Sequence, residues 1–369
     1  MNQDKQYMAR ALELAKKGAG RTSPNPMVGA VIVKDGQIIG EGYHHVYGGP
    51  HAERDAMANC TKDLAGADMY VTLEPCCHYG KQPPCTEAII EAGIRRVVVG
   101  SSVPNPLVFG KGLEILRAHG IQTESGILEE DCLKLNEVFF WYIQTGLPFV
   151  VLKYAMTMDG KIAAYTGKSQ WITGEAARRR VHEDRNRYSA IMTGIGTVLA
   201  DDPMLTCRIE NGKNPVRIIC DSRLQIPEKS RIVQTSGEVP TIIATCCTDK
   251  ERQRPYVSAG CQIMEIEEKD GHLNLGALME ALGKAKIDSV YVEGGLELSW
   301  AVLGSGMVNR VHAYISPKIL GGVQAKTPVG GLGFASPDEA VILKNSTVTP
   351  LGDDFLIESE AKRSVYRNH

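Results

Sequence analysis

The sequence has no long apolar segment and no excess of positive charge. Its first residues, MNQDKQYMAR, lack the basic start and apolar core of a secretory signal, and no run of about 18 apolar residues could cross a membrane. Lys and Arg number 41 against 43 Asp and Glu, which gives a formal net charge of −2. This balance gives no support for non-specific binding to nucleic acid or to an anionic membrane. The sequence therefore predicts a cytoplasmic protein that has neither nucleic acid nor membrane among its partners.

The ten cysteines do not predict a disulfide framework, because thiols stay reduced in the cytoplasm. Most of them, such as Cys132, Cys220 and Cys261, are expected to be small buried hydrophobic residues. Three others, Cys76, Cys77 and Cys85, lie beside prolines and a histidine in the segment LEPCCHYGKQPPC. Their setting needs another explanation.

The chain is long enough for two α/β domains. An alternation of apolar strands with helices breaks at TGLP, residues 145–148, and then restarts, so we expect domains at 1–146 and 147–369. In the second domain the alternation predicts a mainly parallel sheet flanked by helices. In the first, Asp35-Gly36 predicts a hairpin between two strands. The expected helices are 4–17, 50–59, 84–93, 112–118, 175–187, 275–282 and 296–303, and the expected strands are 27–33, 37–43, 69–73, 94–100, 149–154, 190–193, 216–220, 241–245, 289–292 and 310–315.

One histidine, one glutamate and two cysteines form a pattern typical of zinc-dependent deamination. His51 and Glu53 lie where a proline favours the start of a helix, Cys76 follows an expected strand, and Cys85 begins the next expected helix. A hydrolytic zinc site needs three protein ligands, an open position for water, and a carboxylate that moves protons. We therefore expect one Zn²⁺ per chain, held by His51, Cys76 and Cys85, with Glu53 as the catalytic proton shuttle.

Other interpretations of this pattern stay open at the level of sequence. Cys77 or His78 could supply a fourth ligand and make the zinc site purely structural, in a protein that only binds a ligand. The intact Glu53 argues against that alternative, because a structural site needs no proton shuttle. A deaminase of nucleosides or of tRNA would keep the chemistry and change the substrate. The near-neutral charge argues against a polynucleotide.

The chain as a whole resembles the bacterial bifunctional deaminase–reductase family of riboflavin biosynthesis. The resemblance rests on the segments PNPMVG, HAE, VTLEPCCHYGKQPPC, Asn105-Pro106, GKG, LNEVFF, LKYAMTMDGKIA, SQWIT, TVLADDPMLT and VEGG, in this order. It implies an α/β chain in which a cytidine-deaminase-like three-layer domain is followed by a dihydrofolate-reductase-like domain. It also implies that the longer Cys-x8-Cys spacing is the family's form of the zinc motif.

By the same resemblance, the deaminase pocket would bind its pyrimidine and ribose phosphate through Asn25, His44, His78 and Lys81. Several positions differ from the family pattern without removing a ligand. Cys77 replaces a more usual serine, Gln82 replaces a threonine, Arg54 and Asp55 follow Glu53 where an apolar residue is expected, and Val103 replaces an aspartate.

The second domain lacks a complete G-x-G-x-x-G fingerprint, but Gly294-Gly295 lies between an expected strand and an expected helix. Backbone N–H groups at such a position can hold a phosphate, although a glycine pair is more often an ordinary turn. The resemblance implies NADPH as the cofactor, bound by Ala155, Trp171, Thr197, Asp201, Ser222, Gly295, Leu296, Glu297, Leu298, Ser299, Trp300 and Ala301. It implies substrate contacts from Ser169, Arg185, Leu205, Arg208 and Glu293.

Two basic residues of the second domain have competing interpretations. Arg185 suits a phosphate monoester, because its guanidinium group can form two parallel hydrogen bonds, but its charged surroundings also suit a solvated helix face. Lys153, on the first expected strand, could assist near the sugar or nicotinamide, whereas a lysine on a strand is usually a surface residue.

The resulting expectation is a two-step enzyme acting on small phosphoribosylaminopyrimidines. The first domain would deaminate 2,5-diamino-6-(5-phosphoribosylamino)pyrimidin-4(3H)-one. The second would use NADPH to reduce the ribosyl group of 5-amino-6-(5-phosphoribosylamino)uracil to ribityl, with the hydride chemistry supplied by the cofactor. The sequence does not set the oligomeric state, so a homo-oligomer stays open.

Overall fold

The computed structural model describes residues 3–80, 82–102 and 110–361. The chain divides into two compact units, Met1–Gly146 and Leu147–His369. Within the described residues, no helix combines the length and apolar character that a membrane crossing requires.

The first unit is built on a five-stranded mixed sheet. The strand order is β2-β1-β3-β4-β5, with β1 antiparallel to β2 and β3, and with β3, β4 and β5 parallel. Asp35 and Gly36 both have positive φ in the turn between β1 and β2, as the favoured hairpin turns require. The strands are β1 (Gly29–Lys34), β2 (Gln37–Tyr43), β3 (Asp68–Leu73), β4 (Arg96–Ser101) and β5 (Gln122–Ser125).

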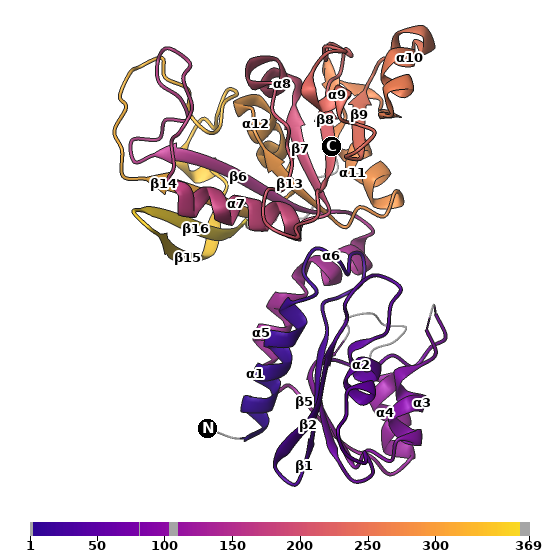
Figure 1. Cartoon of the computed structure of the whole chain (residues 1–369). Helices are drawn as coiled ribbons and strands as arrows, with labels where there is room; N and C mark the ends of the chain where they lie inside the picture. The colour runs from indigo at the N-terminus through magenta and orange to yellow at the C-terminus, as the bar shows by residue number, and fades with distance from the viewer. Residues whose placement is uncertain (1–2, 81, 103–109, 362–369) are drawn as a thin grey trace. The chain divides into compact units, whose positions relative to one another are not determined.

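Helices cover both faces of this sheet, which gives three layers. Alternate residues of the strands point to opposite faces: Val31 and Val98 pack with α1 and α5, while Ile32 and Val97 pack with α2, α3 and α4. Figure 1 shows α1 and α5 on one side of the sheet and α2, α3 and α4 on the other. The helices are α1 (Gln3–Lys16), α2 (Ala52–Ala58), α3 (Cys85–Glu91), α4 (Lys111–Ala118), α5 (Glu129–Leu135) and α6 (Glu137–Thr145).

The second unit contains a nine-stranded sheet in the order β10-β9-β8-β7-β13-β6-β14-β16-β15. The first seven strands in this order are parallel, and β16 and β15 add an antiparallel edge. The strands are β6 (Phe149–Thr157), β7 (Ala190–Gly194), β8 (Val216–Cys220), β9 (Thr241–Thr245), β10 (Gln262–Glu265), β13 (Ser289–Glu293), β14 (Val308–Ser316), β15 (Leu343–Leu351) and β16 (Asp354–Ala361). A small separate hairpin joins β11 (Glu268–Lys269) to β12 (His272–Leu273).

Two apolar cores lie on opposite faces of this second sheet. Leu152 and Val292 pack with α11 and α12 on one face, while Ile191 and Ile243 pack with α8, α9 and α10 on the other. The helices are α7 (Glu175–Arg187), α8 (Ile195–Asp201), α9 (Arg231–Gln234), α10 (Lys250–Ala259), α11 (Leu275–Lys284), α12 (Leu296–Gly304) and the short 3-10 helix η1 (Pro337–Glu339).

Every expected helix and strand occurs in the structure, with ends that differ by a few residues. The expected helix at residue 50 begins at Ala52 instead, which leaves His51 as the residue before the first turn. The sequence pattern did not reveal β5, α5, α6, α8, α9, α10, β10 or the terminal pair β15 and β16. Most of these are short, and the burial pattern of β15 shows little of the alternation that marks a half-buried strand.

Candidate functional site

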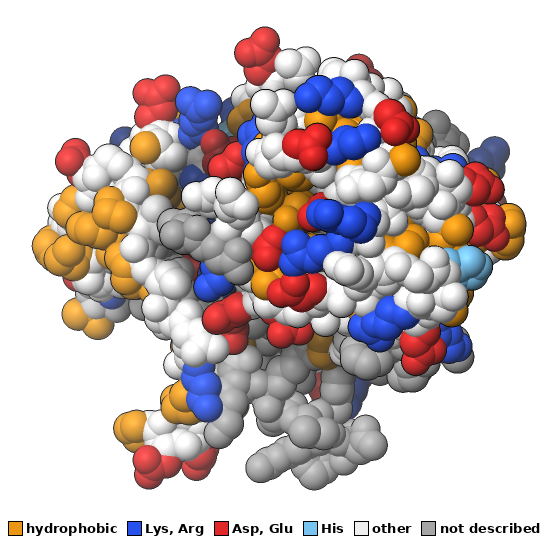
Figure 2. Space-filling model, turned by 90° about the horizontal axis from the view of Figure 1, so that it is seen from below, with side chains coloured by type: hydrophobic (Ala, Val, Ile, Leu, Met, Phe, Trp, Pro, Cys, Tyr) orange, Lys and Arg blue, Asp and Glu red, His pale blue; other side chains and the backbone are white. Residues whose placement is uncertain are grey.

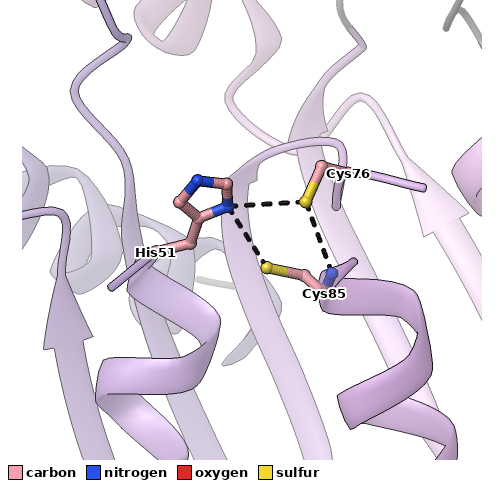
Figure 3. Close-up of side chains that lie close together, drawn as sticks. All are labelled: His51, Cys76 and Cys85. Carbon is pink, nitrogen blue, oxygen red and sulfur yellow. Dashed lines mark hydrogen bonds between the residues drawn. The ribbon is translucent and has the colours of Figure 1, made fainter. Parts of the chain in front are cut away.

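Three side chains from separate segments converge in the first unit. His51 precedes α2, Cys76 follows β3, and Cys85 is the first residue of α3. Figure 3 shows the imidazole of His51 pointing toward both cysteine sulfurs. Each residue offers one ligand atom, and the three atoms all lie within 4.8 Å of one another.

The distances within this cluster suit a zinc ion. His51 Nδ1 lies 3.4 Å from the Sγ atoms of both Cys76 and Cys85. Tetrahedral zinc, with Zn–S about 2.3 Å and Zn–N about 2.0 Å, separates N and S ligands by about 3.5 Å. Hydrogen bonds from Cys85 and His51 lower the pKa of Cys76, which favours thiolate character at this sulfur. The donor set and its spacing therefore fit the implied metal.

Cys77 and His78 do not join this cluster. Among the described residues, His51, Cys76 and Cys85 form the only group of three or more such ligands. Burial raises the pKa of the Cys77 thiol, which disfavours its thiolate form. An arrangement of three protein ligands leaves a fourth position for water, as catalytic zinc sites do.

Glu53 lies beside these three candidate ligands and is almost completely buried. Burial raises the pKa of its carboxyl group, and the neighbouring Cys76 adds to this effect. Glu53 lines the same pocket as His51 and Cys76. A carboxyl group whose pKa is raised can hold and release a proton closer to neutral pH.

This pocket has a volume of about 400 Å³, and a hydrogen-bonded pair forms part of its wall. His44 Nδ1 donates to the Pro50 carbonyl at 2.8 Å, which leaves Nε2 to accept from Asn25 Nδ2 at 3.2 Å. Burial lowers the pKa of His44, consistent with a neutral ring. The Asn25 amide is thereby oriented, with its Oδ1 atom as the remaining acceptor.

Of the two other residues expected in this pocket, His78 and Lys81, the structure describes only His78. His78 is exposed and lines the pocket, together with Gln82. Lys81 lies outside the described residues, as does Val103.

Phe139 and Ile143 of α6 add an apolar wall that the sequence did not reveal as part of the site. The run EVFFWYI was the part of the sequence that could have indicated this wall. Its pattern of apolar residues did not identify it as a helix.

Glu74 is a buried residue for which the sequence indicated no role. Its carboxylate accepts hydrogen bonds from the backbone N–H groups of Gly110 at 3.1 Å and Gly112 at 3.0 Å. These groups lie at the start of α4, where N–H groups have no partner within the helix. Glu74 therefore anchors the segment that leads into Cys76.

In the second unit, Gly294 and Gly295 form a cradle at the start of α12. Both have positive φ, and a Cβ atom on Gly294 would lie 2.7 Å from Thr193 Oγ1 and 2.9 Å from Thr197 Oγ1. Thr193 Oγ1 is buried without a hydrogen-bond partner among the described residues. Backbone N–H groups at a helix N-terminus, with threonine hydroxyl groups beside them, suit the phosphates of a dinucleotide. These residues fit the implied NADPH.

A buried ion-pair cluster lies at the end of β13. Arg185 donates to both carboxylate oxygens of Glu293, from Nε at 2.6 Å and from Nη2 at 3.0 Å, and Lys153 Nζ donates at 3.1 Å. Burial alone would raise the pKa of Glu293, but Arg185 and Lys153 lower it to about 2. The interpretations of Arg185 as a solvated helix residue and of Lys153 as a surface residue are therefore wrong. Arg185 also donates from Nη1 to the carbonyl of Thr206, one residue after the buried Leu205.

The other expected residues of the second unit lie in varied surroundings. Trp171 is exposed, with the Arg178 guanidinium 4.7 Å from its ring centre. Ser222 accepts a hydrogen bond from Leu273 N, and Asp201 and Arg208 are exposed. The remainder are partly buried or lie along α12: Ala155, Ser169, Leu296, Glu297, Leu298, Ser299, Trp300 and Ala301.

Family models match both units. The RibD C-terminal domain model matches residues 148–357, and the model of the cytidine and deoxycytidylate deaminase zinc-binding region matches residues 1–101. The two models follow each other along the chain as the two units do.

Full-length relatives and solved structures carry the same two parts. Riboflavin biosynthesis protein RibD of Actinobacillus pleuropneumoniae is 51% identical over 96% of this chain and 94% of its own length, and that of Escherichia coli is 44% identical over 86% and 89%. A crystal structure from Thermotoga maritima, described as a diaminohydroxyphosphoribosylaminopyrimidine deaminase/5-amino-6-(5-phosphoribosylamino)uracil reductase, has 41% identity and a TM-score of 0.85, covering 98% of this chain and 99% of that chain. Acinetobacter baumannii RibD superposes with a TM-score of 0.86 at 37% identity over the same shares. The chain therefore belongs to the RibD family of bifunctional riboflavin biosynthesis enzymes, which join a zinc-dependent deaminase to an NADPH-dependent reductase.

Proposed function

We propose that residues 1–146 deaminate 2,5-diamino-6-(5-phosphoribosylamino)pyrimidin-4(3H)-one. Residues 147–369 then reduce the ribosyl group of 5-amino-6-(5-phosphoribosylamino)uracil to ribityl. The single observation that carries the first assignment is the convergence of His51, Cys76 and Cys85 beside the buried Glu53 in one pocket. The description of the Thermotoga maritima relative supports the choice of substrates.

In the proposed deamination, His51, Cys76 and Cys85 hold one zinc ion. When bound, zinc lowers the pKa of a water molecule and so supplies a nucleophile near neutral pH. Glu53 would take one proton from the attacking water and give it to a ring nitrogen as the C–O bond forms. It would then take the second proton from the added oxygen and give it to the amine, so that the C–N bond breaks and ammonia leaves as the carbonyl group forms. Its burial and its raised pKa support this role, because the same carboxyl group must both accept and donate.

Substrate binding in this pocket is assigned to polar and apolar groups together. Asn25, oriented by His44, presents its amide to the pyrimidine, while His78 and Lys81 bind the ribose phosphate. The apolar wall of Phe139 would pack against the ring and exclude water from it.

In the proposed reductase, NADPH supplies the hydride when bound. The Gly294-Gly295 turn and the start of α12 would hold its phosphates, with Thr197 beside them, and Ser222 is assigned to the cofactor as well. Ser169, Arg185, Leu205, Arg208 and Glu293 are assigned to the substrate. Because Arg185 already uses its Nε and Nη2 donors on Glu293, the exposed Arg208 is the freer cation for the substrate phosphate.

Small molecules rather than a polynucleotide are the proposed partners. On the face seen in Figure 2, Lys and Arg side chains alternate with Asp and Glu and do not gather into one basic surface. We place the chain in the cytoplasm, where two thiolate ligands remain reduced. Self-association into a homo-oligomer is compatible with this function.

Replacement of Glu53 by glutamine tests the proposed deamination. The amide keeps the size of the side chain but cannot accept the proton, so we expect ammonia release to fall by at least about 100-fold. Metal analysis should show zinc bound at the wild-type level, and NADPH oxidation with supplied deaminated intermediate should be unchanged. Glu91→Gln, at an exposed position in α3, is the matched control. Wild-type ammonia release by Glu53→Gln would disprove the role of Glu53.

A further inference from the structure

Arg54 of α2 is hydrogen-bonded to the segment that leads into α3. Its Nη2 atom donates to the carbonyl oxygens of Pro84 at 3.1 Å and Pro83 at 3.4 Å. α2 begins directly after His51, and α3 begins at Cys85, directly after Pro84. The contact therefore joins the two helix starts that carry two of the three proposed ligands.

The guanidinium group of Arg54 is partly shielded from solvent. Its Nε atom is buried and has no hydrogen-bond partner among the described residues. Removal of this donor from water costs free energy, and a long basic side chain normally extends its charged end into solvent. The two hydrogen bonds to carbonyl groups are strengthened by the charge of their donor and offset that cost.

The position of Cys85 relative to Cys76 and His51 depends on hydrogen bonds that hold the start of α3. Eight residues, 77–84, separate Cys76 from Cys85, and His78, Tyr79 and Gly80 among them are exposed. Two hydrogen bonds join the start of α3 to Cys76: Cys85 N donates to Cys76 Sγ at 3.3 Å, and Thr86 N donates to the Cys76 carbonyl at 3.2 Å. Arg54 adds a link from the start of α3 to α2, the helix that follows His51 and carries Glu53.

We propose that Arg54 is a positioning residue for the metal centre. By holding the carbonyl groups of Pro83 and Pro84, it fixes the Cys85 sulfur at the distance from His51 Nδ1 that zinc requires. This inference rests on the proposed zinc site and adds to it a residue that acts through Cys85, without contact to metal or substrate. It also gives a reason for an arginine at the position after Glu53, where the family pattern has an apolar residue.

Zinc release from the full-length chain tests this role without relying on activity. Wild type, Arg54→Ala, Arg54→Lys and Arg117→Ala are loaded with zinc, and its transfer to an excess of a chromogenic chelator is timed. We expect Arg54→Ala to release zinc about 10–100-fold faster, the range typical when a residue that orients a ligand is lost. Lysine can donate to a carbonyl group but lacks the guanidinium fork, so Arg54→Lys should fall in between. Arg117, an exposed arginine of α4 bonded to Thr123, is the matched control and should change nothing.

The outcomes separate this inference from the proposed function. Wild-type release by Arg54→Ala, from a chain that holds zinc, would overturn the role of Arg54 and leave the zinc site intact. A wild-type chain that holds no zinc would instead contradict the site itself. If Arg54→Ala melts at a lower temperature without metal, Arg54→Lys decides: faster release at an unchanged melting temperature supports the role, and unchanged release overturns it.

Discussion

At the scale of single residues, the clearest case is the buried carboxylate of Glu293. It lies on β13 between Arg185 of α7 and Lys153 of β6, and side chains from three elements thus share one charge cluster. A buried charge is tolerated only where partners replace its water. Glu293 therefore links the packing of the second unit to the position of two cations at its proposed site.

Replacement of Glu293 by glutamine should destabilise the second unit and impair reduction. It leaves two buried cations without a counter-charge, a change that typically costs about 3–5 kcal/mol in the free energy of unfolding. Denaturant unfolding at pH 7 measures the loss. Glu251→Gln, which removes one partner of an exposed pair with Arg254, should change stability by less than about 0.5 kcal/mol.

The loss of stability in Glu293→Gln should depend on pH. The pKa of Glu293 is lowered in the folded chain to about 2, whereas an unfolded glutamate has a pKa of about 4.3. Its stabilising effect is therefore complete above about pH 4.3 and is lost as the pH falls toward 2. The difference between wild type and Glu293→Gln should shrink across this interval, and a difference that stays constant would contradict the ion-pair explanation.

At the scale of elements, three helix starts build the proposed metal site. α2 and α3 begin at or beside the proposed ligands His51 and Cys85, and α4 receives the carboxylate of Glu74, two residues before Cys76. Gly112 makes the last contact possible, because a Cβ atom there would lie 2.4 Å from the Pro75 carbonyl oxygen. The absence of a side chain in α4 thus lets the ligand-bearing segment pack directly against this helix.

Replacement of Gly112 by alanine should separate α4 from this segment. The gain in helix propensity, about 1 kcal/mol, is opposed by a clash with backbone that costs about 1–3 kcal/mol. We expect a lower melting temperature of the first unit and faster zinc release to a chelator. Gly196→Ala, also in a helix but with open space around the added methyl group, should leave stability unchanged or raise it. Equal behaviour of the two variants would show that the contact at Pro75 has no effect.

At the scale of the whole molecule, each unit has cores of its own. The buried clusters of the first unit draw on residues 8–132, and those of the second on residues 150–311. The proposed metal ligands all belong to the first unit, and Gly294 and Gly295 belong to the second. Bound zinc should accordingly stabilise the first unit against unfolding, and bound NADPH the second.

Calorimetry of the full chain should resolve two unfolding transitions. Chelation of zinc should lower the melting temperature of one transition, and NADPH at 100 times its dissociation constant should stabilise the other by about 2.7 kcal/mol. A single transition shifted by both ligands would show that the units unfold together.

The sequence by itself determined the local elements and the identities of the chemical groups. Hydrophobic periodicity located the main strands and helices, because burial of one face imposes a period of 2.0 or 3.6 residues. The pattern of one histidine, one glutamate and two cysteines predicted a zinc site, since few other chemistries combine those groups at helix starts. Helix α6 escaped because its run VFFWYI is apolar on every side and shows no helical period, and α9 escaped because four residues carry too little periodicity to distinguish helix from loop.

Tertiary structure alone decided which of these groups meet and what surrounds them. The sequence indicated no partner for Arg54 and left Arg185 with two competing interpretations, yet the first contacts the prolines before Cys85 and the second the buried Glu293. Glu74 likewise received its role only from the approach of α4. The physical reason is that a charged side chain takes its partner from segments far away in sequence, and packing of the sheet layers brings those segments together.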